Sequence, residues 1–180
     1  MTSHGLDWDP LVIILSGTSS SGKSSLAKVL QRRLSLPAVL IEADRTFPVM
    51  PSPHPAWLTS SPFGVGAALA FHRSVATWAE CGFHVIVDGS LPYENRRLRD
   101  ACLRVFEAFD VRLVGVRCSV DELTMREEQR PDKRPSGWAA RQARDIHNGL
   151  HYAAEVDTTD RSPDDCVEDL VSQLGLPLLA

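Results

Sequence analysis

Residues 17–24 read Gly-Thr-Ser-Ser-Ser-Gly-Lys-Ser and match the pattern G-x-x-x-x-G-K-[ST] at every fixed position. The two glycines allow the backbone to bend so that its N–H groups point at phosphate oxygens. We expect Lys23 to place its charge near the β- and γ-phosphates of a nucleotide, and the Ser24 hydroxyl to contact Mg²⁺. The helix that should begin here has an N-terminus that also favours anions.

The sequence on either side of this loop supports that interpretation. Residues 11–15 form a short apolar, β-branched run, which is typical of a buried parallel strand. After the loop, Leu26, Val29, Leu30 and Leu34 have the spacing of one helix face. Strand, loop and helix is the order that confirms the motif, and it argues against the alternative of a Ser/Gly-rich linker. We therefore predict a nucleotide-binding segment made of Gly17, Thr18, Ser19, Ser20, Ser21, Gly22, Lys23, Ser24 and Ser25.

Strand-like and helix-like segments alternate along the rest of the chain. The apolar strand-like runs are residues 11–16, 38–42, 83–88, 111–117 and 153–157. The helical patterns are residues 22–34, 66–81, 94–108, 119–129, 138–150 and 163–174. This alternation predicts an α/β fold, a doubly wound five-stranded parallel sheet with flanking helices. We expect a flexible leader at residues 1–10 and a single domain at residues 11–180.

Composition excludes several classes of function. The 180-residue chain has a net charge of -4 and a pI of about 5.8, which argues against general nucleic-acid binding. No apolar run approaches the roughly 20 residues of a membrane-spanning helix, and the leader lacks the basic start of a signal peptide. The four cysteines contain no C-x-x-C pair, so we expect no zinc site and a reducing, cytoplasmic location.

Two segments interrupt the alternation. Residues 47–66 contain five prolines and several large apolar side chains, which predicts a long irregular loop, either a wall of a substrate pocket or an insertion packed over the sheet edge. Residues 126–144, counted together with Asp145, carry six basic and four acidic side chains, an excess of +2, with Pro131, Pro135 and Gly137 as interruptions. Next to a phosphate loop, this pattern favours a lid over a nucleotide rather than an ordinary solvated helix face.

Two aspartates follow predicted strands, at the edge of the sheet where ligands bind in doubly wound folds. Asp88 closes an apolar strand, as a Walker B carboxylate does, so we expect it to bind the metal. Asp44 is left for the acceptor side of a phosphoryl transfer, although either aspartate could instead cap a helix. His147 and His151 are four residues apart, but no third ligand accompanies them.

In these residues the chain resembles the chloramphenicol phosphotransferase family of P-loop kinases. The resemblance covers nearly everything after Pro10 and rests on the phosphate loop together with a series of residues that is much more specific. That series is Asp44 with Phe47-Pro48-Val49-Met50-Pro51, Asp88, Val114-Gly115-Val116-Arg117-Cys118, Arg126-Glu127, Arg130, Asp132, Arg134, Gly137, Ala139, Ala140, Gln142, His147, Gly149, Tyr152 and Glu155-Val156-Asp157-Thr158-Thr159.

The resemblance implies a sheet of the nucleoside-monophosphate-kinase type, with ATP and Mg²⁺ as cofactors. It implies transfer of the γ-phosphate to an alcohol, with Asp44 as the base, and with Arg130 and Arg134 stabilising charge on the transferred group. The chain departs from the name-giving member at Gly89, where that protein has a second acidic residue, and at Pro131, where it has glycine. Residues 51–63 show no match.

The function that we expect is therefore a cytoplasmic O-phosphotransferase acting on a small-molecule hydroxyl, with no nucleic acid or membrane as partner. The acceptor could be chloramphenicol or a related antibiotic, which would confer resistance by inactivation. Two alternatives remain open. One is a kinase of another metabolite alcohol, and the other is a nucleotide-dependent regulatory switch, which would need no acceptor base at Asp44.

Overall fold

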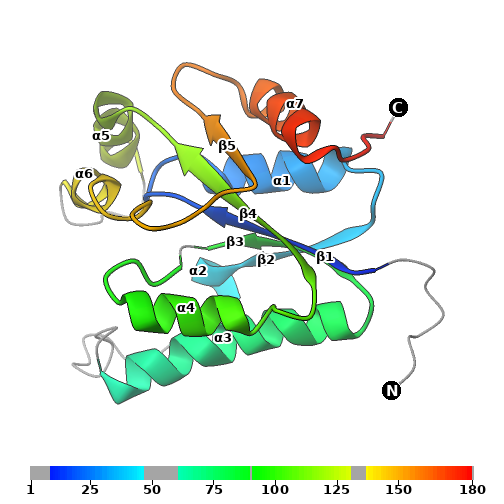
Figure 1. Cartoon of the computed structure of the whole chain (residues 1–180). Coiled ribbons are helices and arrows are strands. Elements are labelled where there is room, and N and C mark those ends of the chain that lie inside the picture. The colour runs from blue at the N-terminus through cyan, green and yellow to red at the C-terminus, as the bar shows by residue number, and fades with distance from the viewer. Residues whose placement is uncertain (1–8, 47–60, 90, 131–136, 180) are drawn as a thin grey trace.

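The computed structural model describes residues 9–46, 61–89, 91–130 and 137–179 (Figure 1). Five strands form one sheet: β1 (Leu11–Ser16), β2 (Ala38–Glu42), β3 (His84–Asp88), β4 (Asp110–Arg117) and β5 (Ala154–Asp157). Their order across the sheet is β2-β3-β1-β4-β5, and every neighbouring pair is parallel. The predicted five-stranded parallel sheet is confirmed.

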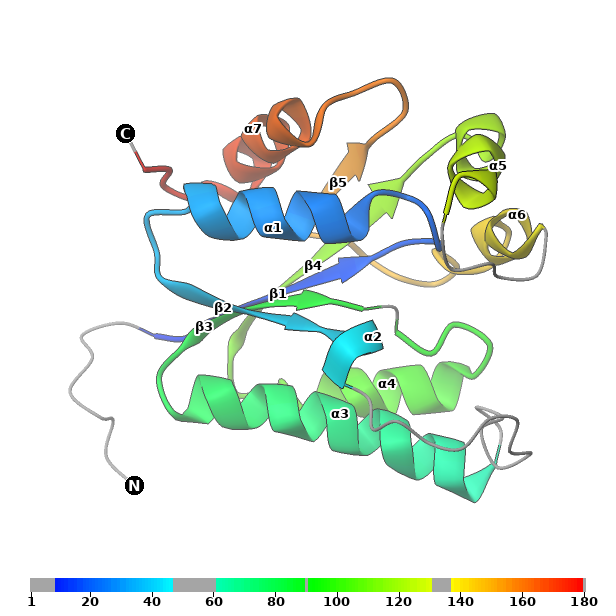
Figure 2. The same ribbon diagram turned by 180° about the vertical axis from the view of Figure 1, so that it is seen from behind.

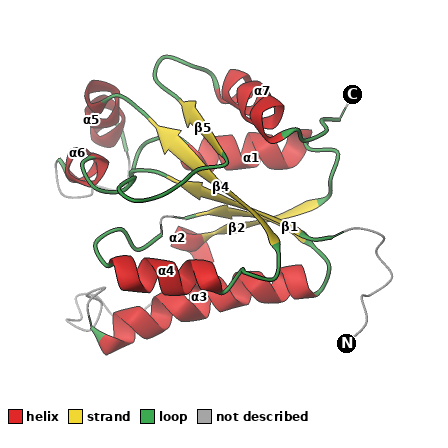
Figure 3. Cartoon of the chain, viewed as in Figure 1, coloured by secondary structure: helices red, strands yellow, loops and turns green. Residues whose placement is uncertain are grey.

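Helices cover both faces of this sheet (Figure 3). The helices of the described residues are α1 (Lys23–Arg33), α2 (Ala43–Thr46), α3 (Pro62–Glu80), α4 (Arg96–Arg104), α5 (Val120–Glu128), α6 (Trp138–Ala143) and α7 (Pro163–Leu174). Figures 1 and 2 show α1 and α7 on one face and α3 and α4 on the other. Because strand side chains alternate between the faces, Ile13 and Leu15 of β1 pack in the core with α1 and α7, while Val12 and Ile14 pack with α3 and α4.

The remaining helices lie where the strands end. Parallel strands bring their carboxyl ends to the same edge of a sheet. At this edge the chain places the loop between β1 and α1, the short helix α2 after β2, and the pair α5 and α6 after β4 (Figure 2). The fold therefore gathers three separate stretches of sequence around one edge.

Four helices differ from the prediction, and one of them, α4, ends at Arg104, where residues 94–108 were expected to be helical. Helix α3 begins at Pro62 rather than residue 66, because Pro62 takes the first helical position and the Ser61 hydroxyl caps the helix by accepting the Gly64 N–H at 3.0 Å. The expectation of irregular structure is thus wrong for residues 62–66, and residues 47–60 lie outside the described residues. Helix α6 ends at Ala143, where residues 138–150 were expected to be helical, and helix α2 was not predicted.

Within the described residues, no helix combines the length and apolar character needed to cross a membrane.

Candidate active site

The phosphate loop lies between β1 and α1, and its two glycines are required by its geometry. A Cβ atom on Gly17 would lie 2.2 Å from the carbonyl oxygen of Val116 on β4, so the loop can pass the sheet only without a side chain. Gly22 has a φ of 85°, in the left-handed region that glycine adopts at little cost. The loop then enters α1 with its backbone N–H groups at the helix N-terminus, which is an anion-binding arrangement.

Polar groups in the loop are arranged for an anionic ligand. The Lys23 ammonium donates to the carbonyl oxygens of Gly17 at 2.8 Å and Thr18 at 2.5 Å, which keeps its charge over the loop. The hydroxyl oxygens of Ser20 and Ser21 are buried, and neither has a hydrogen-bond partner among the described residues. Buried hydroxyls are normally bonded, and phosphate oxygens can accept from them. The loop therefore fits a nucleotide phosphate.

Arg126 connects helix α5 to the phosphate loop through Thr158. The Arg126 guanidinium donates to the Thr158 hydroxyl at 3.1 Å and to the Thr158 carbonyl at 2.9 Å. The Thr158 hydroxyl in turn donates to the carbonyl of Ser21 at 2.9 Å. Glu122, one turn earlier on α5, pairs with Arg126 at 2.6 Å. A residue of the predicted lid is thus fixed to the loop after β5 and to the phosphate loop.

Helix α6 is held by two further contacts. The Glu127 carboxylate accepts the backbone N–H groups of Gly137 and Ala139, both at 3.2 Å, and so caps the N-terminus of α6. From the other side, the amide oxygen of Gln142 accepts the Ser19 N–H at 2.8 Å in a buried contact. Arg130 Nη1 lies 3.5 Å from the Ser19 hydroxyl, which brings this arginine to the phosphate loop as expected. Arg134 lies outside the described residues.

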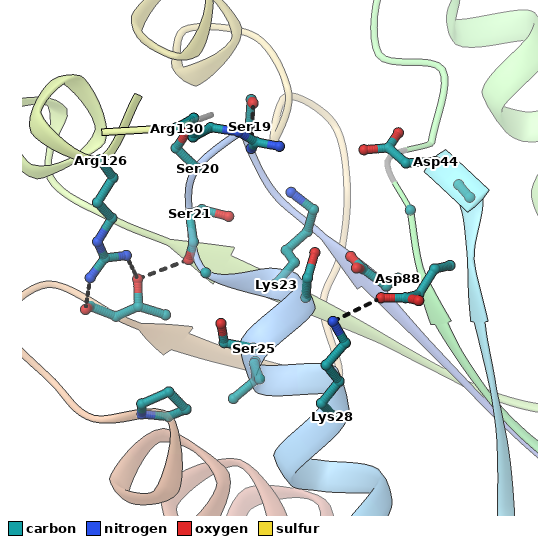
Figure 4. Close-up of a pocket in the computed structure, with 18 of the residues that line it drawn as sticks. Ser19, Ser20, Ser21, Lys23, Ser25, Lys28, Asp44, Asp88, Arg126 and Arg130 are labelled. Atoms are coloured by element: carbon teal, nitrogen blue, oxygen red, sulfur yellow. Dashed lines mark hydrogen bonds and ion pairs between the residues drawn. The ribbon is translucent and has the colours of Figure 1, made fainter. Parts of the chain in front are cut away.

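The two aspartates, Asp44 and Asp88, both line the cleft on the side of the phosphate loop that faces away from α5 and α6. Asp88 ends β3 and is 8% exposed, whereas Asp44 lies on the exposed helix α2. Figure 4 shows their carboxylates and the Lys23 ammonium pointing into the same space. In this space, no side chain from the described part of the protein is bonded to the Asp88 carboxylate. Asp88 and the exposed Ser24 offer two oxygen ligands, and Mg²⁺ usually takes few protein ligands and keeps water and phosphate oxygens for the rest.

His147 is used structurally in this fold. Its Nδ1 lies 2.7 Å from the Tyr152 hydroxyl, and the two rings meet edge to face. Burial lowers the pKa of His147, and the positive charges of Arg117 and Lys23 lower it further. Among the described residues no group of three His, Cys, Asp or Glu side chains is placed to hold a metal ion.

These elements enclose a cleft of about 830 Å³. Its lining includes residues 19–26 of the loop and α1, Asp44 on α2, Asp88 and Gly89 after β3, and Arg126 and Arg130 after β4. The structure thus brings together every described residue that the sequence analysis placed in the donor, metal and acceptor sites, except that Gly17 and Thr18 lie beneath the cleft and do not line it.

Three residues that line the cleft, Gln142, Glu42 and Lys28, escaped the prediction from residue patterns. Gln142 reaches Ser19 across 123 positions of sequence, and only the family resemblance singled it out. Glu42 and Lys28 line the cleft as an ion pair at 3.2 Å. No motif marks either residue, because their meeting depends on how β2 and α1 are placed in space.

Comparisons with known proteins identify the family and the fold of this chain. The profile of the "Chloramphenicol phosphotransferase-like protein" family matches residues 11–175. A relative in Mycobacterium tuberculosis strain H37Rv, named "Putative O-phosphotransferase", is 33% identical over 172 residues, covering 82% of this chain and 75% of the relative.

Two solved structures share the fold. One is the Mycobacterium tuberculosis APS kinase CysC in complex with AMPPNP and APS, with a TM-score of 0.67 and 19% identity over 93% of this chain and 98% of that one. The other is a gluconokinase from Sinorhizobium meliloti, with a TM-score of 0.64 and 19% identity over 93% of each chain. The family match, the relative and the kinase fold together make this protein a small-molecule phosphotransferase, and the chain belongs to the chloramphenicol phosphotransferase-like protein family.

Proposed function

We propose that this protein transfers the γ-phosphate of ATP to a hydroxyl group of a small molecule. The observation that carries the proposal is the cleft, in which a phosphate loop faces two carboxylates from the ends of β2 and β3. Chloramphenicol or a related antibiotic is the first acceptor to test, because the chain belongs to the family named after that reaction. In that case the protein confers resistance by phosphorylating the drug.

On the donor side, the loop holds the phosphates. The N–H groups of Ser20 and of residues 22–25 and the hydroxyls of Ser20 and Ser21 donate to phosphate oxygens, and Lys23 turns its ammonium toward the β- and γ-phosphates. ATP supplies the phosphoryl group. Arg130, and Arg134 by the family resemblance, place positive charge where negative charge spreads over the transferred group.

On the metal side, Ser24 and Asp88 hold Mg²⁺. The ion would neutralise charge on the phosphates, as metals do in phosphoryl transfer. Asp88 is well placed for this role because it is nearly buried at the end of a strand and faces Lys23 across the cleft (Figure 4).

On the acceptor side, Asp44 accepts the proton of the attacking hydroxyl. A bond forms between the acceptor oxygen and the γ-phosphorus, and the bond from that phosphorus to the bridging oxygen of ADP breaks. The hydroxyl proton passes to the Asp44 carboxylate, and the electron pair of the broken bond stays on ADP. Its exposed position on α2 leaves Asp44 accessible to an acceptor that enters from solvent.

ATP consumption with and without a panel of alcohols tests the proposal and separates it from the alternatives. The panel contains chloramphenicol, related antibiotics, sugars and shikimate-like alcohols, and Lys23→Ala serves as the control for contaminating activity. Turnover that depends on an antibiotic supports the proposal in full. Turnover with a sugar or another metabolite keeps the reaction and replaces the acceptor. Slow hydrolysis that no alcohol accelerates would favour the nucleotide-dependent switch.

A further inference from the structure

We propose that Glu42 is a positioning residue, which fastens the helix carrying Asp44 to the helix that follows the phosphate loop. The inference rests on the proposed function in one respect, the role of Asp44 as the base. Nothing in the sequence pattern around Glu42 marks it, and it stands at the end of β2, two residues before Asp44.

Three contacts of Glu42 join separate elements. One carboxylate oxygen lies 3.2 Å from the Lys28 ammonium on α1, and the other lies 3.0 Å from Nε of Arg45 on α2. The backbone carbonyl of Glu42 also accepts the Thr46 hydroxyl at 2.8 Å. The Glu42 side chain is only 16% exposed, whereas those of Lys28 and Arg45 are 45% and 73% exposed. The carboxylate is thus the sheltered member of both pairs, and salt still screens the exposed cations in part.

Helix α2 needs such an anchor. It has four residues, none of them fully buried, and its apolar packing comes from the small side chain of Ala43, so this packing contributes little to holding the helix in place. One side of α2 rests on the end of β3, where a Cβ atom on Gly89 would lie 2.8 Å from the Ala43 side chain. The close approach at Gly89 and the ion pairs of Glu42 together fix the helix against the sheet and α1.

The register of the strands places this anchor next to the reacting groups. Glu42 is the β2 partner of Asp88 on β3. Lys28 is four residues after Ser24, one turn further along the same face of α1. Figure 4 shows Lys28 reaching toward the carboxylates beside Asp88. Glu42 therefore links the helix that carries the metal-binding serine to the helix that carries the base.

The link has a kinetic consequence. A misplacement of a reacting group by about 1 Å can cost on the order of 100-fold in rate. Glu42→Gln keeps the shape of the side chain and removes its charge, so both ion pairs weaken and Asp44 loses its fixed position. We expect kcat to fall about 10-fold while the KM for ATP stays unchanged, because the phosphate loop is held by other contacts.

The decisive experiment combines dynamics with kinetics. Backbone order parameters of residues 43–46 are measured by NMR in the wild type, Glu42→Gln and Lys28→Met. Glu168→Gln is the matched control, because it removes an α1 ion pair, to Arg33 at 3.0 Å, on the side facing α7. We expect values of about 0.85 in the wild type and the control, and values approaching about 0.6 in Glu42→Gln and Lys28→Met.

The kinetic arm asks whether Glu42 acts through Asp44. In an Asp44→Asn background, Glu42→Gln should cause no further loss of kcat, since the group it positions is already disabled. Unchanged order parameters in both variants overturn the inference even if the protein proves to be no transferase. Equal, additive losses of kcat in both backgrounds also overturn it. If the wild type shows no transfer activity but residues 43–46 loosen in Glu42→Gln and Lys28→Met, the proposed function is refuted and the anchoring of α2 by Glu42 is established.

Discussion

The donor and acceptor sides of the cleft are built in different ways. On the donor side, Thr18, Ser19 and Ser21 are 3%, 7% and 0% exposed, and residues from β4, α6 and the loop after β5 contact the phosphate loop. On the acceptor side, helix α2 has no buried residue and is held by polar contacts of Glu42 and by the packing of Ala43 at the end of β3. Under the proposed function, the nucleotide is therefore held by a densely packed part of the fold, whereas the acceptor meets a part that is exposed to solvent.

Asp44→Asn tests the acceptor side and should have the largest effect. The substitution keeps the size of the side chain and removes its basicity, so kcat should fall by roughly two to four orders of magnitude. The affinity for an ATP analogue, measured by calorimetry, should remain as in the wild type.

Asp88→Asn is the matching substitution on the metal side, because it replaces the other carboxylate of the cleft by an amide. Its defect should appear as a higher Mg²⁺ concentration needed for half-maximal rate, measured by Mg²⁺ titration. If Asp44→Asn turns over normally and Asp88→Asn does not, the two roles are reversed. If neither substitution matters, the proposed transfer reaction is wrong.

Lys23→Ala tests the donor side. Removing one positioned donor of this kind typically lowers the rate by about 100- to 1,000-fold, and we expect a loss of that size. The melting temperature without nucleotide should barely change, because Lys23 is only partly buried and bonds to its own loop. Turnover like that of the wild type would contradict the assignment of the nucleotide site.

Gly17→Ala tests whether the donor side depends on close packing. The added methyl would collide with the Val116 carbonyl, so the free energy of unfolding should fall by about 1–3 kcal/mol, or more if the backbone cannot move. Gly66→Ala is the control, because a Cβ there meets nothing within 4 Å and lies in α3. Urea denaturation should show that this control is neutral or more stable by about 0.5–1 kcal/mol. Equal stability of the two variants would show that the phosphate loop at Gly17 does not pack tightly against β4.

Acidification tests the scaffold beneath both sides and should have the smallest effect. The Leu11 N–H donates to Nδ1 of His84 at 3.0 Å, and burial lowers the pKa of His84. Because the unfolded chain binds this proton more readily, stability is complete above the unfolded pKa of about 6.5 and declines as the pH falls through the lower folded pKa. His84→Gln should therefore lose less stability than the wild type between about pH 7.5 and about pH 5, measured by urea denaturation. A steeper acid loss in this variant would contradict the account.

The sequence predicted the sheet well because each strand is an apolar run bounded by turns. All five strands appear within one residue of the expected ends. Helix α2 could not be predicted, since four residues carry no helical periodicity. The end of α6 at Ala143 was missed because residues 144–150 continue a helix-like pattern, although Gly149 has a φ of 69° that is unsuited to a helix.

The parts of the site that consist of a short, continuous sequence motif were predictable. The phosphate loop is one continuous stretch, and Asp44 and Asp88 each follow a recognisable strand. The contacts of Gln142 with Ser19 and of Glu42 with Lys28 were not predictable, because they join elements that only the fold brings together.

Transfer of labelled phosphate tests the central claim most directly. The wild type, Asp44→Asn and Lys23→Ala are incubated with Mg²⁺, γ-³²P-labelled ATP and the acceptor that most accelerates ATP consumption, and the products are separated by chromatography. We predict that the wild type places the label on the acceptor through a phosphate ester, and that both variants lose this product while Asp44→Asn still binds the nucleotide. Label found only as inorganic phosphate with every acceptor would contradict the account.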